Sequence, residues 1–117
     1  MVKYVPHGKA RVVRLGPGCR LDEYGTFGGD VVGVVTALIK NGRYPQQGWA
    51  VNHECDELVF VLGGTGALEM PGEEITLEKR DTVFIPKGQK FAWRGRRLEL
   101  LLLSVPAWSA KQYTIFE

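Results

Sequence analysis

The chain has 117 residues, of which 44% are apolar and 24% are charged, so it is long enough to fold around one core of its own. Its 15 basic and 13 acidic side chains leave a net charge of +2, a balance that indicates no nucleic-acid partner. No uninterrupted apolar run reaches the roughly eighteen residues that cross a bilayer, and the first residues lack the pattern of a secretion signal. We therefore expect a single cytoplasmic domain over residues 1–117 that contacts neither membrane nor nucleic acid.

Short runs of β-branched and aromatic residues, separated by glycine and proline, recur along the whole chain. Such runs are typical of strands. No segment has apolar residues at i, i+3, i+4 and i+7 over three turns, as an amphipathic helix would. We therefore expect about nine strands and almost no helix. In chain order, the predicted strands are residues 10–15, 31–39, 48–53, 58–62, 66–70, 82–85, 90–93, 98–105 and 112–116.

Glycine and proline mark the turns between several of these strands. The glycine cluster at residues 63–66 favours positive φ angles, which predicts a tight chain reversal between the strands on either side. Pro71 and Gly72 predict a second hairpin bend. Many short strands in a small chain favour a sandwich or a barrel, because either covers sheet edges that would otherwise aggregate. The predicted fold is an all-β jelly-roll barrel.

A histidine and a carboxyl group lie close together near the middle of the chain. Side chains alternate along a strand, so Trp49, Val51 and His53 share one face. If the apolar members face the core, His53 does too, and Glu57 begins the next strand beside it. Cys55 lies in the turn between them, where side chains usually point to solvent. We therefore predict that His53 and Glu57 face one cavity as candidate catalytic residues.

Aromatic and amide side chains near this pair are candidates for a ligand-binding wall. Aromatic rings could stack against a sugar ring or another planar ligand, and polar groups at the rim could donate hydrogen bonds to it. Core packing would explain the aromatic residues equally well. The predicted ligand-binding residues are Tyr44, Gln46, Trp49, Val51, Phe91 and Trp93.

The spacing of these residues resembles the cupin family, whose signatures are G(X)5HXH(X)3,4E(X)6G and G(X)5PXG(X)2H(X)3N on a small β-barrel. His53 takes the place of the second histidine, Glu57 follows at the three-residue spacing, and Gly64 closes the first signature. Pro86 and Gly88 match the second signature. The resemblance spans most of the chain and implies the double-stranded β-helix of the cupins, which is a jelly-roll barrel.

The same resemblance implies a metal site that this chain keeps in part. Cupins with all ligands hold iron, manganese, nickel or zinc through three histidines and a glutamate. Val51 and Phe91 stand at two of the histidine positions and cannot ligate a metal. His53 and Glu57 remain, with Cys55 as a substitute third ligand. We predict no tightly held metal, and we interpret His53 as a neutral imidazole that is hydrogen-bonded to Glu57 or to the backbone.

Three functions are compatible with this pattern. The first is a barrel that binds a small polar metabolite, such as a carbohydrate, without a metal. The second is an isomerase or epimerase in which His53 and Glu57 exchange protons with the substrate. The third is a dioxygenase-like metalloenzyme whose reduced shell of His53 and Glu57 is completed by water, substrate or Cys55. The resemblance also implies a homodimer, to which residues 1–30 would contribute an N-terminal arm.

Overall fold

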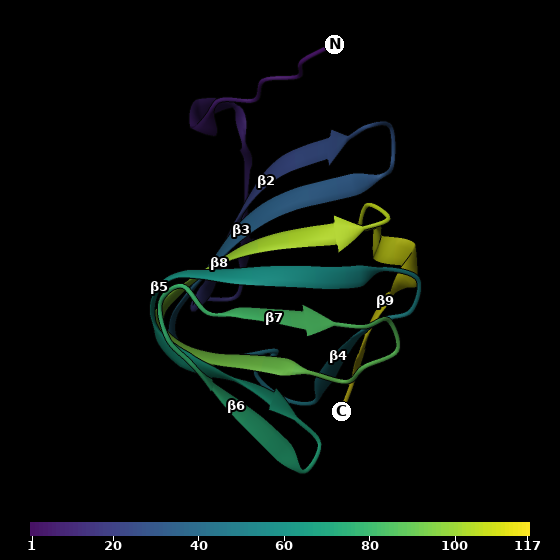
Figure 1. Ribbon diagram of the computed structural model, residues 1–117. Coiled ribbons are helices and arrows are strands. Elements are labelled where there is room, and N and C mark those ends of the chain that lie inside the picture. Colours follow the sequence, from purple (N-terminus) through teal and green to yellow (C-terminus); the bar gives the residue numbers. More distant parts are fainter.

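The computed structural model describes all residues, 1–117, as a barrel of nine strands with two short 3₁₀ helices (Figure 1). The strands are β1 (Arg11–Leu15), β2 (Cys19–Phe27), β3 (Val32–Tyr44), β4 (Trp49–Asn52), β5 (Asp56–Met70), β6 (Glu73–Leu77), β7 (Thr82–Ile85), β8 (Ala92–Val105) and β9 (Tyr113–Phe116). The 3₁₀ helices are η1 (His7–Lys9) and η2 (Ala110–Gln112). The predicted number of strands and the near absence of helix are confirmed. No helix has the length and apolarity that a membrane span requires.

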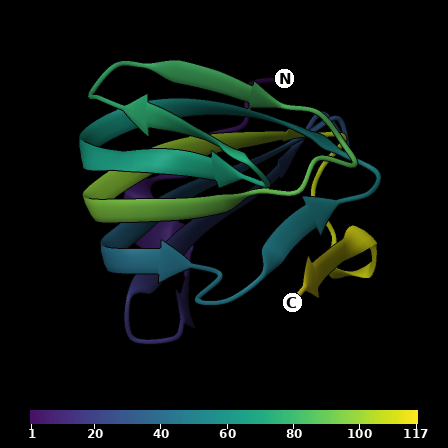
Figure 2. The same cartoon turned by 90° about the horizontal axis from the view of Figure 1, so that it is seen from below.

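Seven strands form one antiparallel sheet, and the other two pair separately. The sheet has the order β1-β2-β3-β8-β5-β6, and β7 pairs with the first half of β5. β4 pairs with β9. The long strands β3, β5 and β8 curve strongly, so that the sheet wraps around toward the β4–β9 pair (Figure 2). The structure therefore has the all-β jelly-roll architecture that the sequence predicts.

The glycine cluster in the middle of β5 bends one strand instead of separating two, so the predicted reversal is wrong. The pairing of β5 with β8 shifts register on both sides of Gly63. Gly64 has a φ of 79°, and a Cβ atom there would lie 1.9 Å from the carbonyl oxygen of Arg97. Odd-numbered residues face the interior before the bend, whereas Leu68 and Met70 face it after the bend. The bend therefore exchanges the faces of the two halves of β5.

Two strands lie where the sequence predicts none. β2 mixes charged and apolar residues, and β6 is exposed at every position except Leu77, so neither contains an apolar run. The hairpin bend predicted at Pro71 and Gly72 is confirmed, because Leu68 pairs with Ile75 across it. Predicted strands 90–93 and 98–105 form most of the single strand β8.

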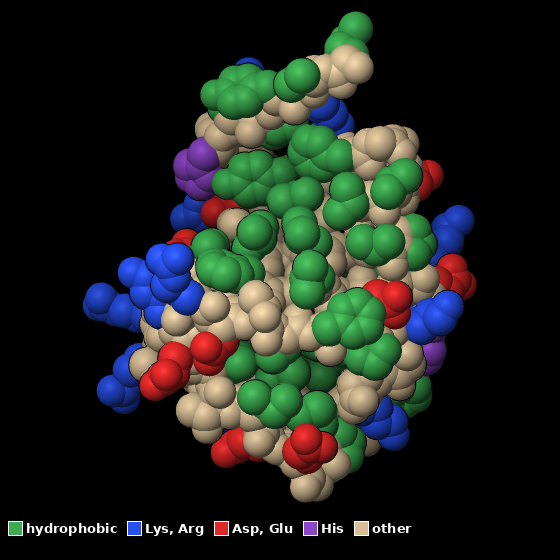
Figure 3. Space-filling model, in the orientation of Figure 1, with side chains coloured by type: hydrophobic (Ala, Val, Ile, Leu, Met, Phe, Trp, Pro, Cys, Tyr) green, Lys and Arg blue, Asp and Glu red, His purple; other side chains and the backbone are tan.

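The outer face of the sheet is also rich in apolar side chains. Val34, Leu103, Leu58 and Phe84 follow one another across β3, β8, β5 and β7 in a single cross-strand row. Leu58 is 47% exposed and Phe84 is 60% exposed. Figure 3 shows hydrophobic side chains gathered over this face. The sheet therefore has one apolar face inside the barrel and a second one in contact with solvent.

The N-terminal segment consists of an extended stretch followed by two strands. Residues 1–6 precede η1 and extend away from the barrel, with Met1, Val2 and Tyr4 largely exposed (Figure 1). The following residues fold back as β1 and β2, of which β1 pairs with β2 and β2 pairs with the chain's own β3.

Candidate functional site

A cavity of about 210 Å³ lies inside the barrel. Inward-facing residues of β1, β2, β3, β5 and β8 build most of its wall, and β4, β9 and the segment before β9 complete it. The wall is mainly apolar, with 14 hydrophobic residues among 19. The lining residues are Val13, Leu15, Cys19, Leu21, Glu23, Val35, Ala37, Ile39, Tyr44, Pro45, Ala50, Asn52, Glu57, Phe91, Trp93, Leu102, Ser104, Trp108 and Tyr113.

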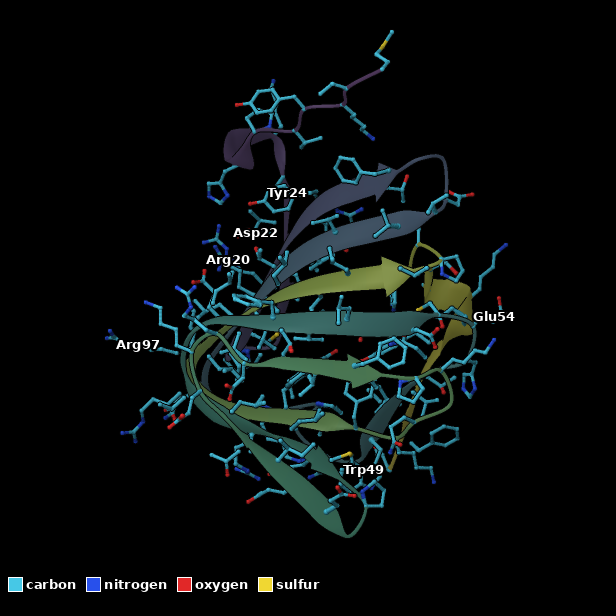
Figure 4. All side chains as sticks on the ribbon, viewed as in Figure 1. Arg20, Asp22, Tyr24, Trp49, Glu54 and Arg97 are labelled. Atoms are coloured by element: carbon cyan, nitrogen blue, oxygen red, sulfur yellow. The ribbon has the colours of Figure 1, made fainter.

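Strand β2 illustrates how alternation builds this wall. Arg20, Asp22 and Tyr24 project from the outer side of β2, where they are labelled in Figure 4. Leu21 and Glu23 lie between them in the sequence and line the cavity. Because polar residues occupy the outer positions, β2 has no apolar run that would predict a strand. Its inner positions supply part of the site.

Glu57 is a buried acid in the cavity wall. The alternation of β5 turns it inward together with Val59 and Val61, and it is 8% exposed. The Ser104 hydroxyl donates a hydrogen bond to Oε2 of Glu57 over 3.3 Å. Burial raises the pKa of Glu57 to about 7, although hydrogen bonds from Ser104 and Asn52 act to lower it. None of the ion pairs in the protein includes this carboxyl group, so it has no positively charged partner.

Asn52 connects Glu57 to the C-terminal segment. Its Oδ1 atom accepts hydrogen bonds from Nε1 of Trp108 over 3.0 Å and from Nε2 of Gln112 over 2.9 Å. Because Oδ1 is occupied in this way, the amide NH₂ group is the end of Asn52 that is free to face Glu57, and Asn52 acts to lower the pKa of that acid. Gln112 is fixed in turn, because its Oε1 accepts from the backbone N–H of Glu54 over 3.0 Å. The C-terminal segment thus orients the amide that faces the buried acid.

Five aromatic side chains surround the remainder of the cavity. Phe91 and Trp93 meet edge to face with ring centroids 6.1 Å apart, and Trp108 meets Tyr113 in the same way at 5.4 Å. The fifth is Tyr44, which lines the cavity next to Tyr113. Burial raises the pKa of both tyrosines, so both are uncharged at neutral pH.

The prediction that His53 and Glu57 face one cavity is wrong. β4 turns Ala50 and Asn52 into the cavity, so His53 lies on the opposite face. His53 is exposed, and its Nε2 atom is 2.7 Å from the hydroxyl oxygen of Thr114, with which it is hydrogen-bonded. The structure therefore leaves Glu57 without His53 as a partner.

The predicted ligand-binding residues divide into two groups. Three of them line the cavity, namely Tyr44, Phe91 and Trp93. Gln46 is exposed. The guanidinium group of Arg43 lies over Trp49, 4.8 Å from the centroid of the tryptophan ring. Val51 is buried, but it does not line the cavity. This burial of Val51 on the other face of β4 is why apolar character did not reveal which face looks inward.

Cys55 is buried, contrary to the prediction that it points to solvent. It is 1% exposed, and its thiol donates a hydrogen bond to Oε1 of Gln112 over 3.6 Å. Burial, together with the nearby acid Glu57, raises the pKa of Cys55 to about 11, so the thiol is protonated at neutral pH. Both cysteines are free and buried, as Cys19 is also buried.

The inward residues show that the cupin signature fits this chain one residue earlier than predicted. With the four-residue spacing that the signature also allows, its two histidine positions fall on Ala50 and Asn52, and Glu57 keeps its place. These three residues and Phe91, at the histidine position of the second signature, all line the cavity. Only Glu57 among the four is a common metal ligand. No group of three or more His, Cys, Asp or Glu side chains could hold a metal ion, so this donor set does not fit the iron, zinc, manganese or nickel site.

A second hollow of about 400 Å³ adjoins the cavity. It lies at the turn between β1 and β2 and the end of β3, and it is more polar. The two hollows share four lining residues, namely Leu15, Cys19, Ile39 and Tyr44.

Comparisons with known proteins agree with this architecture. The Cupin domain family profile matches residues 41–105. No curated protein sequence matches the chain. Streptomyces PAC13, solved with uridine and described as a nucleoside dehydratase, has a TM-score of 0.86 at 17% identity, over 100% of this chain and 92% of that chain.

Two further solved structures share the fold. The polyketide cyclase RemF from Streptomyces resistomycificus has a TM-score of 0.72 at 17% identity, over 90% of this chain and 80% of that chain. KdgF from Halomonas sp. has a TM-score of 0.73 at 16% identity, over 89% of this chain and 94% of that chain. At these identities, the likeness concerns the fold alone.

Proposed function

Because this chain belongs to the cupin family, we propose that it binds a small organic molecule in the barrel cavity without a metal ion. In this proposal, Glu57 forms a hydrogen bond with the bound molecule or transfers a proton to or from it. One observation carries the proposal. Glu57 lies in the cavity wall, 8% exposed and without a positively charged partner, and its pKa is raised to about 7.

The raised pKa suits Glu57 to acid–base chemistry. A group that titrates near neutral pH is present in both protonated and ionised forms, so it can donate or accept a proton. Isolated buried carboxyl groups are costly, and they are found disproportionately at functional sites. Dehydration and cyclisation, the reactions named for PAC13 and RemF, both move protons, and these proteins share the barrel fold. An isomerase or epimerase role would therefore depend on Glu57 and not on His53.

The composition of the wall changes the expected ligand. A carbohydrate carries many hydroxyl groups, and each needs a hydrogen-bonding partner when it is buried. The cavity has 14 hydrophobic residues among 19, and its buried polar side chains, Asn52, Glu57 and Ser104, lie close together. We therefore propose a mostly apolar ligand with one polar end at Glu57. The donor set of the cavity does not fit a metal, so the residues present do not support a dioxygenase-like metal site.

Ligand-observed NMR with four probes, benzylamine, benzyl alcohol, benzamide and uridine, tests whether the cavity binds small molecules. We expect at least one probe to bind to the unchanged protein. Its binding should be lost in Ala50→Leu, because leucine places three more carbons in the cavity. His53→Gln is the matched control, because His53 follows the same strand but faces away, and binding should not change. No binding by any probe, or unchanged binding to a folded Ala50→Leu variant, would contradict the proposal.

We also propose that the outer face of the sheet forms a homodimer interface. The cross-strand row that includes Leu58 and Phe84 supports this, because large exposed apolar patches usually mark interaction surfaces. Light scattering should give the mass of a dimer for the unchanged protein and that of a monomer for Phe84→Lys. A monomer in both samples would count against the dimer.

A further inference from the structure

We propose that the ligand of this cavity is an organic cation, either a protonated amine or a quaternary ammonium group. Its nitrogen lies against Glu57, and its hydrocarbon part fills the part of the cavity that aromatic residues line. This inference rests on the proposed function, because it concerns the same cavity. It adds the charge and the chemical class of the ligand.

The charges in the cavity wall favour a cation. Two lining residues, Glu57 and Glu23, carry carboxyl groups, and no lysine, arginine or histidine lines the wall. Glu23 is at the accessible side, where its side chain is 30% exposed and lies 3.7 Å from Nε of Arg11. Glu57 is 8% exposed and has only neutral donors, such as the Ser104 hydroxyl at 3.3 Å. The charge that the protein leaves without a partner is therefore negative, and it is inside the cavity.

The other titratable groups near Glu57 do not change this sign. Tyr113 of β9, Tyr44 of β3, Cys19 of β2 and Cys55 before β5 are all acids. Burial raises the pKa of each of them, so all four are uncharged at neutral pH. When Glu57 is ionised, the cavity is negative, and none of these groups can make it positive.

The aromatic residues provide the second, independent argument. Five aromatic residues line the cavity. They come from β3, from β8 and the residue before it, and from the C-terminal segment, and they are Tyr44, Phe91, Trp93, Trp108 and Tyr113. The faces of aromatic rings attract cations, and groups of such rings are the usual surroundings of bound ammonium groups. A neutral hydrocarbon would also pack here, but it would leave the buried carboxyl group without a positively charged partner. A cation with an apolar body satisfies both parts of the wall.

A cationic ligand and a neutral ligand should show opposite pH dependence of their binding affinity. An ammonium group binds the ionised form of Glu57, so it should bind better above pH 7. A neutral hydrogen-bond acceptor binds the protonated form, so it should bind better below pH 7. A bound cation also offsets the desolvation that raises the pKa of Glu57, so amine binding should release a proton from the protein.

Calorimetric titration with benzylamine, benzyl alcohol and benzoate tests the charge preference. These probes share one ring and differ in charge. At pH 8 we expect benzylamine to bind about tenfold or more tightly than benzyl alcohol, and benzoate not to bind. Between pH 8 and pH 5.5, the affinity for benzylamine should fall about thirtyfold, because the ionised fraction of Glu57 falls by that factor.

Two variants separate the buried carboxyl group from the accessible one. Glu57→Gln keeps the shape and removes the charge, so benzylamine should lose about tenfold or more in affinity, together with its pH dependence, while benzyl alcohol binding persists. Glu23→Gln should change benzylamine affinity by less than about threefold, because that carboxyl group is partly solvated and already close to Arg11.

The outcomes distinguish this inference from the proposed function. If benzyl alcohol binds as tightly as benzylamine at pH 8, and Ala50→Leu displaces both, the cavity is a binding site and the preference for cations is refuted. If Glu57→Gln leaves benzylamine affinity unchanged, the preference is refuted as well. If no probe binds at either pH, the inference and the proposed function both fail.

Discussion

The two ends of β5 each carry a glutamate, and the two carboxyl groups have opposite electrostatic environments. Glu69 accepts hydrogen bonds from Nε of Arg43 over 2.9 Å and from Nε of Arg94 over 2.6 Å, and these two arginines hold its pKa below the ordinary value. Glu57 faces the cavity with neutral neighbours only, and burial raises its pKa to about 7. Two glutamates on one strand therefore differ: Glu69 forms ion pairs with arginines, whereas Glu57 is an acid without a counter-ion.

This difference is the reason for proposing a function for Glu57 and not for Glu69. An ion pair such as the one at Glu69 holds strands together, as Arg43 is on β3 and Arg94 is on β8. A buried carboxyl group without a counter-ion destabilises the fold when it is ionised, so its presence needs another reason. The bend at Gly63 and Gly64 separates the two environments, because it exchanges the faces of β5 between Glu57 and Glu69.

The largest effect is expected from removing the bend. Gly64→Ala places a Cβ atom 1.9 Å from the carbonyl oxygen of Arg97, at a φ of 79° that alanine rarely adopts. We expect a loss of more than about 3 kcal/mol in the free energy of unfolding, or no folded protein. Gly63→Ala is the matched control, because no atom lies within 4 Å of its added Cβ; it should cost less than about 1 kcal/mol. Equal losses in urea unfolding would show that the bend does not depend on Gly64.

The next largest effect concerns the pH dependence of stability at Glu57. Because its folded pKa is raised above the ordinary value of 4.5, the contribution of Glu57 to stability is most favourable at acidic pH and becomes less favourable as pH rises toward about 7. The loss between pH 4.5 and pH 8 should be about 3 kcal/mol. Glu57→Gln should remove this loss and unfold at a higher urea concentration than the unchanged protein at pH 8. A parallel pH profile for the two proteins would contradict the isolated-acid interpretation.

The smallest effect, with the opposite sign, is expected at Glu69. Its lowered pKa gives stability that is present above the ordinary pKa and is lost as pH falls through the lowered one. Glu69→Gln should therefore cost about 1 kcal/mol at pH 7 and less at acidic pH. High salt should shrink the difference, since the side chain of Arg94 is 56% exposed. Unfolding curves at pH 3.5 and pH 7, in low and high salt, provide the measurement; a loss that grows at acidic pH would argue against the ion pair.

The strands could largely be predicted from the sequence, because alternating and apolar runs report which residues are buried. The errors lie where that signal is weak or ambiguous. β6 buries only Leu77, so it has no apolar run to detect. The glycines at 63–66 allow positive φ both in a reversal and in a strand bend, and only the pairing of β5 with β8 decides between them.

The site could be predicted less well, and for particular physical reasons. The sequence points to Glu57 because an acid follows a turn at the start of an apolar strand. It also predicts His53 in the cavity because Val51 is apolar, but the outer face of β4 is also covered, so both faces look alike in sequence. Trp108 and Tyr113 reach the cavity through the pairing of β9 with β4, which no local pattern reveals. The four-residue spacing of the signature was the one sequence feature that pointed to Asn52.

The most direct test of the account is an NMR titration of the side-chain carboxyl carbon of Glu57, with Glu69 as an internal reference. The account predicts an inflection near pH 7 for Glu57, and one below pH 4.5 for Glu69. An inflection of Glu57 at or below pH 4.5 would show that its carboxyl group is solvated or paired, and it would contradict the central claim that the cavity holds an isolated acid.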